Sequence, residues 1–574
     1  MKQGSFQVYA GKLEKEFTAA LRRGTRANLL PNIMAGKAGV FTRNVTLKRL
    51  IANRLGWTKV ASKMKRQLPA IEKFGQEVFK ARIAHVVLMG MGGSSLCPEL
   101  FKLMFRRHPR LKSFDVIDST DPDAVNAVAR RIDLKRSLFI VASKSGGTVE
   151  TRSQEAHFIQ RLQAAGIRDF GRHFVAITDK GSALERFGRK HKYRKVFLNP
   201  PDIGGRYSAL SYFGLVPGFF AGVDLRALIN DAVMMEKLLS ARLDETNPAL
   251  VLASFMAAGA KTGRDKLTFL ASRQTAPLVP WVEQLLAEST GKKGKGVVPI
   301  EAEPVGRDND YGKDRLFVTF KVVGESDPIK AQLKRKLLAR KCPLLEMSLG
   351  SKNELGRQFL LWEAATAATG YFLGVNPFDE PNVTESKNNT NEILAGYERI
   401  GTLPEEEAIA RWGKLSLIAV ECPRPYTRAH LSDFRQLLRR FFTGVRPPKY
   451  FAILNYFKSD RRTETALAKI RSTVRSKTGI ATIRGYGPRY LHSIGQLYKG
   501  GPQDGLFIVF VRGRYGRANI PGRPFNFGQL IRAQASGDAR ALASRKLPLL
   551  VIEIESKPAE GLEYFSRVIK SALA

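Results

Sequence analysis

The chain has little cysteine and little histidine for its size. Its 574 residues include three cysteines and seven histidines. Cys97, Cys342 and Cys422 lie far apart in sequence and show no spacing of a zinc or redox motif. This pattern excludes a dense disulfide framework. We expect no metal, no cofactor and a reduced compartment.

Long apolar runs are also missing. The longest ones, near 250–260 and 506–511, are shorter than the roughly 20 residues that cross a bilayer. The N-terminal residues lack the apolar core of a signal peptide. We therefore expect no membrane partner and a cytoplasmic protein.

The chain has fewer acidic than basic residues. There are 52 Asp and Glu against 94 Lys and Arg, so the formal net charge is +42. Polyanion binding and a plainly solvated basic surface are both open interpretations. The cations are scattered along the chain, and no helix-turn-helix, zinc-finger or RNA-binding signature accompanies them, so we expect no specific nucleic acid partner. The positive electrostatic field of the protein would still attract an anionic substrate.

Apolar residues make up 44% of the chain, which indicates a globular protein. Its length of 574 residues is enough for two to four domains. Residues 1–60 and 224–261 are predicted to be helical. Elsewhere, apolar runs alternate with loops and helical stretches, which predicts parallel sheets covered by helices. The predicted strands are 85–89, 114–117, 138–142, 174–178, 267–271, 316–322, 344–348, 450–454, 506–511 and 549–554.

These patterns predict an α/β fold with two sheet-containing domains. A helical N-terminal extension covers 1–60, the first domain covers 61–235 and the second covers 236–574. A proline-rich boundary at 446–449 sets off a C-terminal α/β portion, 436–574. Whether this portion belongs to the second domain or forms a small third one stays open.

A glycine-rich loop, GMGGSS at 90–95, follows the first predicted strand. Its glycines allow the backbone to approach an anion beside a helix N-terminus. A simple tight turn is an equally open interpretation. A dinucleotide fingerprint is disfavoured because it needs Gly or Ala where Ser95 stands.

A second loop, SKSGGT, combines hydroxyls, an ammonium and glycines within six residues. Hydroxyls and backbone N–H groups at a helix start suit a phosphate dianion. The order does not match a Walker A loop. Thr148 could merely cap the following helix, but capping explains only one hydroxyl. The predicted phosphate-binding residues are Ser143, Lys144, Ser145, Gly146, Gly147 and Thr148.

Two further segments carry candidate catalytic groups. In DIGGRYS, two glycines precede Arg206, whose fixed charge could stabilise an oxyanion; an ordinary surface arginine is the alternative. In WVEQLLAESTGKKGKG, Gln284 and Glu288 stand four residues apart and so share one helix face. A carboxylate beside cations is what proton abstraction next to a carbonyl requires.

Together these segments resemble the glucose-6-phosphate isomerase family, which has the sugar isomerase (SIS) fold. The likeness covers about residues 50–560 and is nearest to the isomerase half of bifunctional transaldolase/glucose-6-phosphate isomerases. It implies two SIS-type domains with a second domain that could be permuted, a sugar-phosphate substrate and a homodimer. The matching words are GMGGSS, DSTDP, SKSGGTVET, AITDKGSAL, GGRYSALS, WVEQLLAESTGKKGKG, GVNPFDEPNVTESK and LHSIGQLYKGG.

The resemblance also implies roles for individual residues. Glu288 would move a proton between C1 and C2, and Arg206 would stabilise the cis-enediolate. Lys387 and His492 would lie near the ring oxygen, with His492 assisting ring opening. Substrate contacts would come from the phosphate loop and from Gly93, Ser94 and Gln284.

Two features depart from the family pattern. His492 follows Lys387 in this sequence, whereas in the family the segment with the histidine ordinarily precedes the segment with the lysine. Glu380 stands where glutamine is usual and would add negative charge. A non-catalytic sugar-phosphate-binding regulator is the alternative function, and a nicotinamide-dependent enzyme is a weaker third.

Overall fold

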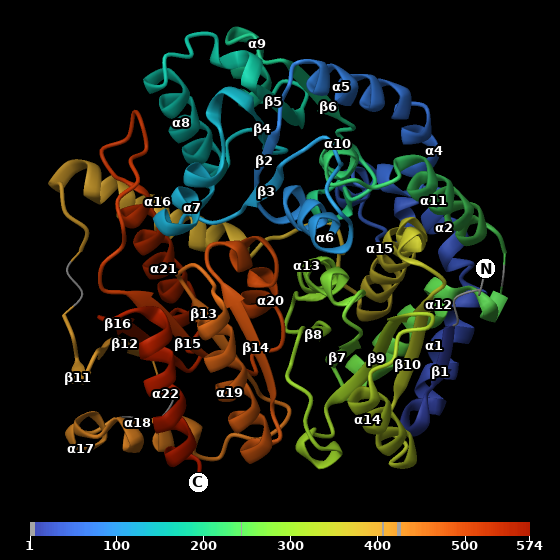
Figure 1. Cartoon of the computed structure of the whole chain (residues 1–574). Coiled ribbons are helices and arrows are strands. Elements are labelled where there is room, and N and C mark those ends of the chain that lie inside the picture. Colours follow the sequence, from blue (N-terminus) through green and yellow to red (C-terminus); the bar gives the residue numbers. More distant parts are fainter. Residues whose placement is uncertain (1–5, 243, 405–406, 422–425) are drawn as a thin grey trace.

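The computed structural model describes residues 6–242, 244–404, 407–421 and 426–574 and contains three sheets (Figure 1). The first sheet is parallel throughout. Its central strands are buried along their whole length, as expected when helices cover both faces. Its strands, in spatial order, are β3 (Ser113–Ile117), β2 (His85–Gly90), β4 (Ser137–Ala142), β5 (Phe174–Asp179) and β6 (Lys195–Asn199).

Alternate side chains of the first sheet enter different cores. Val86 and Leu88 point into the largest core, whereas Val87 and Met89 point into another one that includes residues from far along the chain. The helices of this region are α5 (Leu68–Lys80), α6 (Leu96–Met104), α7 (Pro122–Arg131), α8 (Val149–Ala164), α9 (Ala183–Lys190) and α10 (Tyr212–Phe220).

The second sheet takes one strand from the N-terminal residues. In spatial order it comprises β1 (Phe6–Tyr9), β10 (Leu344–Leu349), β9 (Arg315–Val322), β7 (Lys266–Ala271) and β8 (Val298–Ile300). Only β1 runs antiparallel. Helix α1 (Glu14–Arg26) packs on α12 (Pro248–Lys261), so the N-terminal segment is joined to this sheet. The other early helices are α2 (Leu29–Met34), α3 (Val45–Ala52) and α4 (Val60–Lys65).

The C-terminal portion has a sheet of its own. In spatial order it comprises β11 (Ala410–Trp412), β12 (Leu415–Glu421), β16 (Leu549–Ile554), β15 (Gly505–Arg512), β13 (Tyr450–Asn455) and β14 (Ala481–Tyr486). The last four are mutually parallel, and β11 and β12 form an antiparallel edge. Its helices are α17 (Arg428–Ser432), α18 (Phe434–Phe442), α19 (Arg461–Thr478), α20 (Gly495–Gly500), α21 (Phe527–Ala543) and α22 (Pro558–Ala572).

Cores are shared between these regions. Ala287 and Val298 pack with side chains of the third sheet, and residues of α21 pack against the first sheet. The predicted boundaries at 235 and 436 therefore remain predictions, because no clean break in packing marks them. The strand order confirms an α/β fold with several mostly parallel sheets.

All ten predicted strands are present. Among the described residues, five of the six missed strands lie at sheet edges; β8 has three residues, and β14 reads ATIRGY with a glycine and an arginine. The sixth, β12, reads LSLIAVE and lies inside its sheet, so its apolar run was overlooked. Within the described residues, Cys97 and Cys342 are free thiols; Cys422 lies outside them.

Helix α13 (Val279–Thr290) lies where the three regions meet (Figure 1). It packs against α15 (Leu355–Leu373), β8 and α20. Helix α15 packs in turn against α11 (Leu225–Ser240), and both contribute to the largest core. The remaining helices are α14 (Pro328–Ala339) and α16 (Val383–Ile400). None of the described helices combines the length and apolarity needed to cross a bilayer.

Candidate active site

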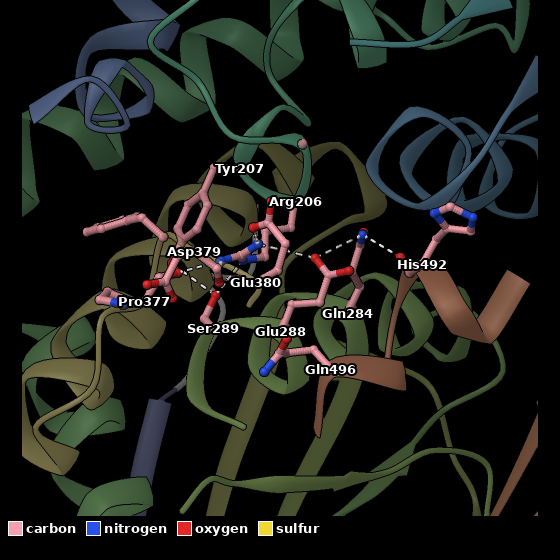
Figure 2. A network of polar contacts seen from close by, with 12 residues as sticks. Arg206, Tyr207, Gln284, Glu288, Ser289, Pro377, Asp379, Glu380, His492 and Gln496 are labelled. Carbon is pink, nitrogen blue, oxygen red and sulfur yellow. Dashed lines mark hydrogen bonds and ion pairs between the residues drawn. The ribbon is translucent and has the colours of Figure 1, made fainter. Parts of the chain in front are cut away.

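Gln284 and Glu288 lie on one face of α13, as their spacing predicts. The Nε2 atom of Gln284 is 3.4 Å from Oε2 of Glu288, and both side chains are buried (Figure 2). The helix ends at Thr290, and Gly291 is its C-cap residue. The pair therefore points into the protein and not to solvent.

Arg206 lies directly opposite Glu288. Its Nη1 atom is 3.3 Å from Oε2 of Glu288 and 3.0 Å from Oε2 of Glu380. Its other N–H groups donate to Ser289 Oγ and to the carbonyls of Pro377 and Asp379, all at 2.9 Å. Because only 4% of the residue is exposed, Arg206 is a buried fixed cation, not an ordinary surface arginine.

Glycines bring this arginine loop into place. A Cβ atom at Gly93 would lie 2.0 Å from the carbonyl oxygen of Gly205, so the GMGGSS loop packs backbone to backbone against the loop that carries Arg206. Gly92 has φ +55°, and a Cβ there would lie 2.6 Å from the carbonyl oxygen of His492. The first loop thus supports two candidate catalytic residues by close packing. The sugar-binding role of Gly93 and Ser94 stays a prediction.

Burial raises the pKa of Glu288 to about 7. The positive charge of Arg206 opposes this shift, and the negative charge of Glu380 adds to it. A carboxyl group with a pKa near neutrality can both accept and return a proton under ordinary conditions, which suits a general base. Nearby, burial lowers the pKa of Lys292 to about 8, and its ammonium pairs with Asp379 at 2.8 Å.

The SKSGGT loop connects β4 to α8. The hydroxyls of Ser143 and Thr148 lie 2.9 Å apart, and the former accepts from the backbone N–H of Gly146 at 3.1 Å. Lys144 points elsewhere: its Nζ binds Asp179 at 2.5 Å and the carbonyl of Pro201 at 3.1 Å. The structure therefore brings the hydroxyls together but holds the ammonium of this loop on a different carboxylate.

The far end of the loop opens on a cavity of about 220 Å³. The candidate residues Lys387, from α16, and His492, from the turn Arg489–His492, line the same cavity. The segment LHSIGQLYKGG, which carries His492 and follows Lys387 in this sequence, therefore reaches the same site as the phosphate loop. The lining residues are Ser145, Gly147, Thr148, Val149, Glu150, Val383, Ser386, Lys387, Thr390, Asn391, Leu491, His492, Lys499 and Gln534.

His492 connects this cavity to α13. Its carbonyl oxygen accepts a hydrogen bond from Nε2 of Gln284 at 2.8 Å, whereas its ring extends beyond Gln284, away from Arg206 (Figure 2). The ring Nε2 lies 2.9 Å from Oε1 of Glu150. A continuous series of contacts therefore runs from Arg206 through Glu288 and Gln284 to His492.

Glu150 was not predicted from the sequence. Burial acts to raise its pKa, but the charge of His492, its hydrogen bond and the charge of Lys387 outweigh burial, so the pKa falls below its ordinary value. An ionised carboxylate only accepts hydrogen bonds, so the His492 Nε2 must carry a proton. Nδ1 is then left as the ring atom that can exchange a proton with a ligand.

Other cavity residues were also missed. Lys499 lies within the LHSIGQLYKGG word and Glu150 within SKSGGTVET, so both stood inside recognised segments. Ser386 directly precedes Lys387. Gln534 lay in a segment with no motif, and only tertiary contact reveals it. Within the described residues, no group of three or more His, Cys, Asp or Glu could hold a metal ion.

The family model described as phosphoglucose isomerase matches residues 55–301. Glucose-6-phosphate isomerase from Acaryochloris marina is 33% identical over 380 residues, which cover 58% of this chain and 72% of that protein. The one from Cyanothece sp. is 30% identical over 386 residues, with coverages of 59% and 73%.

The chain belongs to the phosphoglucose isomerase family. It is therefore an isomerase, as the sequence predicts. Among solved structures, a hypothetical protein from Thermus thermophilus has a TM-score of 0.58 at 25% identity and covers 68% of this chain and all of its own. Glucose-6-phosphate isomerase from Chlamydia trachomatis has a TM-score of 0.51 at 18% identity, with coverages of 68% and 86%, and shows the same fold.

The phosphoglucose isomerase match contains the first sheet, Arg206 and α13 but ends before Lys387 and His492. In this family member, the C-terminal sheet region therefore completes a cavity whose other wall lies in the matched region. This division between the matched region and the C-terminal region fits the position of His492 after Lys387 in the sequence.

Proposed function

We propose that the protein interconverts glucose 6-phosphate and fructose 6-phosphate through a cis-enediolate, with Glu288 as the base. The observation that carries this proposal is the position of Glu288. It is buried, has a pKa of about 7 and lies 3.3 Å from a fixed arginine. Family membership gives the substrate class, because the relatives are named glucose-6-phosphate isomerases.

The phosphate group would bind at the SKSGGT loop. Ser145, Gly147 and Thr148 line the cavity at the start of α8, where backbone N–H groups favour an anion. Lys387 lines the same cavity, and the described residues offer it no ion pair or hydrogen bond. Its charge is therefore available to a phosphate or a ring oxygen. Lys144 would contribute only if it left Asp179.

Ring opening would fall to His492. A pyranose opens when its ring oxygen gains a proton and the anomeric hydroxyl loses one. Nδ1 of His492 can supply or accept that proton, while Glu150 holds Nε2–H. The same carboxylate stabilises the charged imidazolium that forms when the ring takes up a proton.

Isomerisation follows on the open chain. Glu288 takes the proton from C2 of the aldose, and the C1 carbonyl oxygen becomes the enediolate oxygen. The proton then returns at C1, while the hydroxyl proton of O2 passes to O1, so that O2 becomes the ketone oxygen. The aldehyde is reduced and the alcohol is oxidised within one molecule, so no external redox partner enters the balance. The charge of Arg206 would stabilise the enediolate.

A substrate oxygen must find a place among the partners of Arg206. All five N–H groups of this side chain donate to protein acceptors. Glu380 is its most exposed acceptor, with 48% of the side chain accessible. We propose that the substrate replaces Glu380. This would also remove a negative charge from Glu288 at the moment of reaction.

The direct test is turnover. Purified protein is given fructose 6-phosphate, and glucose 6-phosphate formation is measured with a coupled assay. Turnover by wild type that falls roughly 10²–10⁴-fold in Glu288→Gln supports the proposal. A wild type that binds sugar phosphate without turnover would instead favour the non-catalytic regulator. Glu283→Gln is the matched control, because Glu283 is on the same helix and lines a separate cleft.

A further inference from the structure

Helix α21, from the C-terminal sheet region, carries two buried polar side chains near the cavity, and Gln534 lines it. Gln534 and Asp538 are four residues apart and therefore share one face. Only 2% of Gln534 and 1% of Asp538 are exposed. Asp538 accepts from Ser386 Oγ at 2.9 Å and Tyr490 OH at 2.5 Å, and pairs with Lys499 at 2.7 Å. This face thus holds the segments that carry Lys387 and His492.

Gln534 has a narrower set of contacts. Its Nε2 donates to Oε1 of Glu150 at 2.8 Å, and its Oε1 accepts from Oγ1 of Thr120 at 2.6 Å. The direction is determined by Glu150, since an ionised carboxylate offers only acceptors. Thr120 is completely buried. The result is a buried series of hydrogen bonds from Thr120 through Gln534 to Glu150.

Two donors meet on the same carboxylate oxygen. The Nε2 atoms of Gln534 and His492 lie 2.8 and 2.9 Å from Oε1 of Glu150. A second donor fixes the orientation of the carboxylate and favours its ionised form. The other charged or titratable groups that face Glu150 are Lys387 from α16 and Tyr456, which follows β13.

We propose that Gln534 is a positioning residue: its amide fixes the Glu150 oxygen that orients the His492 ring for acid–base exchange through Nδ1. Gln534 acts through Glu150 and transfers no proton itself. This inference rests on the proposed isomerase function for its catalytic consequence, but the hydrogen-bonded arrangement has its own observable, the tautomer of His492.

The direction of the change expected on removing the Gln534 amide follows from the negative charge of Glu150. Without the Gln534 amide, the ionised form of Glu150 loses a donor, so its pKa rises. Protonated Glu150 no longer holds Nε2–H of His492. Because the pKa of Glu150 starts below its ordinary value, this rise stays below the acidic limb that Glu288 sets at about 7. We therefore expect a loss of kcat of about tenfold, because the Nε2–H of His492 loses its fixed acceptor.

The test uses Gln534→Met, which keeps the size of the side chain and removes the amide. Gln154→Met is the matched control: Gln154 is fully buried on the same helix as Glu150 but donates to the carbonyl of Ser119 at 2.9 Å. We expect the loss of kcat in the former variant only, with KM within about twofold of wild type. A kcat equal to that of wild type, or an equal loss in the control, would overturn the inference.

Thr120→Val gives a second variant with little change in volume. It removes the donor that holds Oε1 of Gln534, so we expect a smaller loss of kcat. If Gln534→Met does not fold, a wild-type kcat in Thr120→Val overturns the inference.

The His492 tautomer separates this inference from the proposed function. Imidazole ¹⁵N signals, assigned with His492→Ala, should show protonated Nε2 in wild type and a tautomer mixture in Gln534→Met. If wild type shows no turnover but the tautomer changes, the function is wrong and the positioning role stands. An unchanged tautomer in Gln534→Met contradicts the positioning role, whatever the turnover.

Discussion

Nη1 of Arg206 lies 3.3 Å from the carboxylate of Glu288, and both side chains are buried. The guanidinium is held by Ser289, Pro377 and Asp379 on its other nitrogens, so it cannot follow the carboxylate if that moves. A fixed cation beside a movable proton carrier is the arrangement that stabilises charge as it develops on a substrate oxygen.

Arg206→Lys should therefore damage both catalysis and folding. A lysine ammonium cannot replace the planar set of five donors, so we expect kcat to fall roughly 10²–10³-fold. The carbonyls of Pro377 and Asp379 would lose donors, which should lower the free energy of unfolding by about 1–3 kcal/mol. Steady-state kinetics and denaturant unfolding measure the two effects.

Arg226→Lys is the control for Arg206→Lys. Arg226 pairs with Glu72 on the surface, and 63% of its side chain is exposed. Its substitution should change neither quantity appreciably. If Arg206→Lys kept wild-type kcat, the assigned role of Arg206 would be wrong.

Glu380→Gln should move the acidic limb of kcat/KM to lower pH. Glu288 must be ionised to act as a base, and its pKa of about 7 is raised in part by the charge of Glu380. Removing that charge lowers the pKa of Glu288, so the base stays ionised to a lower pH. A pH profile of kcat/KM measures the shift. If the acidic limb stayed in place or moved to higher pH, the proposal that the charge of Glu380 raises the pKa of Glu288 would be wrong.

The sequence could predict those features that depend on local pattern. Long apolar runs marked the ten strands, and the i, i+4 spacing placed Gln284 and Glu288 on one face. Contacts between distant segments had no local signal. The carbonyls that bind Arg206 are more than 170 residues away in sequence, and Gln534 meets Glu150 across 384 residues. Lys144 looked suited to phosphate, but its pairing with Asp179 depends on the neighbouring strand end.

Glu288 and His492 are connected within one chain. Gln284 contacts the carboxylate of the first and the carbonyl of the second. A homodimer stays a prediction, but the described residues complete this cavity without a second chain. We therefore expect that mixing Glu288→Gln with His492→Ala protein, after unfolding and refolding together, restores no activity.

Separately refolded variants provide the baseline for that mixing experiment. Activity of the co-refolded mixture well above their sum would mean that His492 acts in the site of a neighbouring subunit.

The most direct test of the central claim, that Glu288 carries a proton between C2 and C1, is deuterium incorporation. Wild type and Glu288→Gln are incubated with fructose 6-phosphate in D₂O, and the sugar carbons are followed by NMR. We predict deuterium at C1 of fructose 6-phosphate and C2 of glucose 6-phosphate with wild type, and almost none with the variant. Incorporation by Glu288→Gln at the wild-type rate would contradict the assignment of the base.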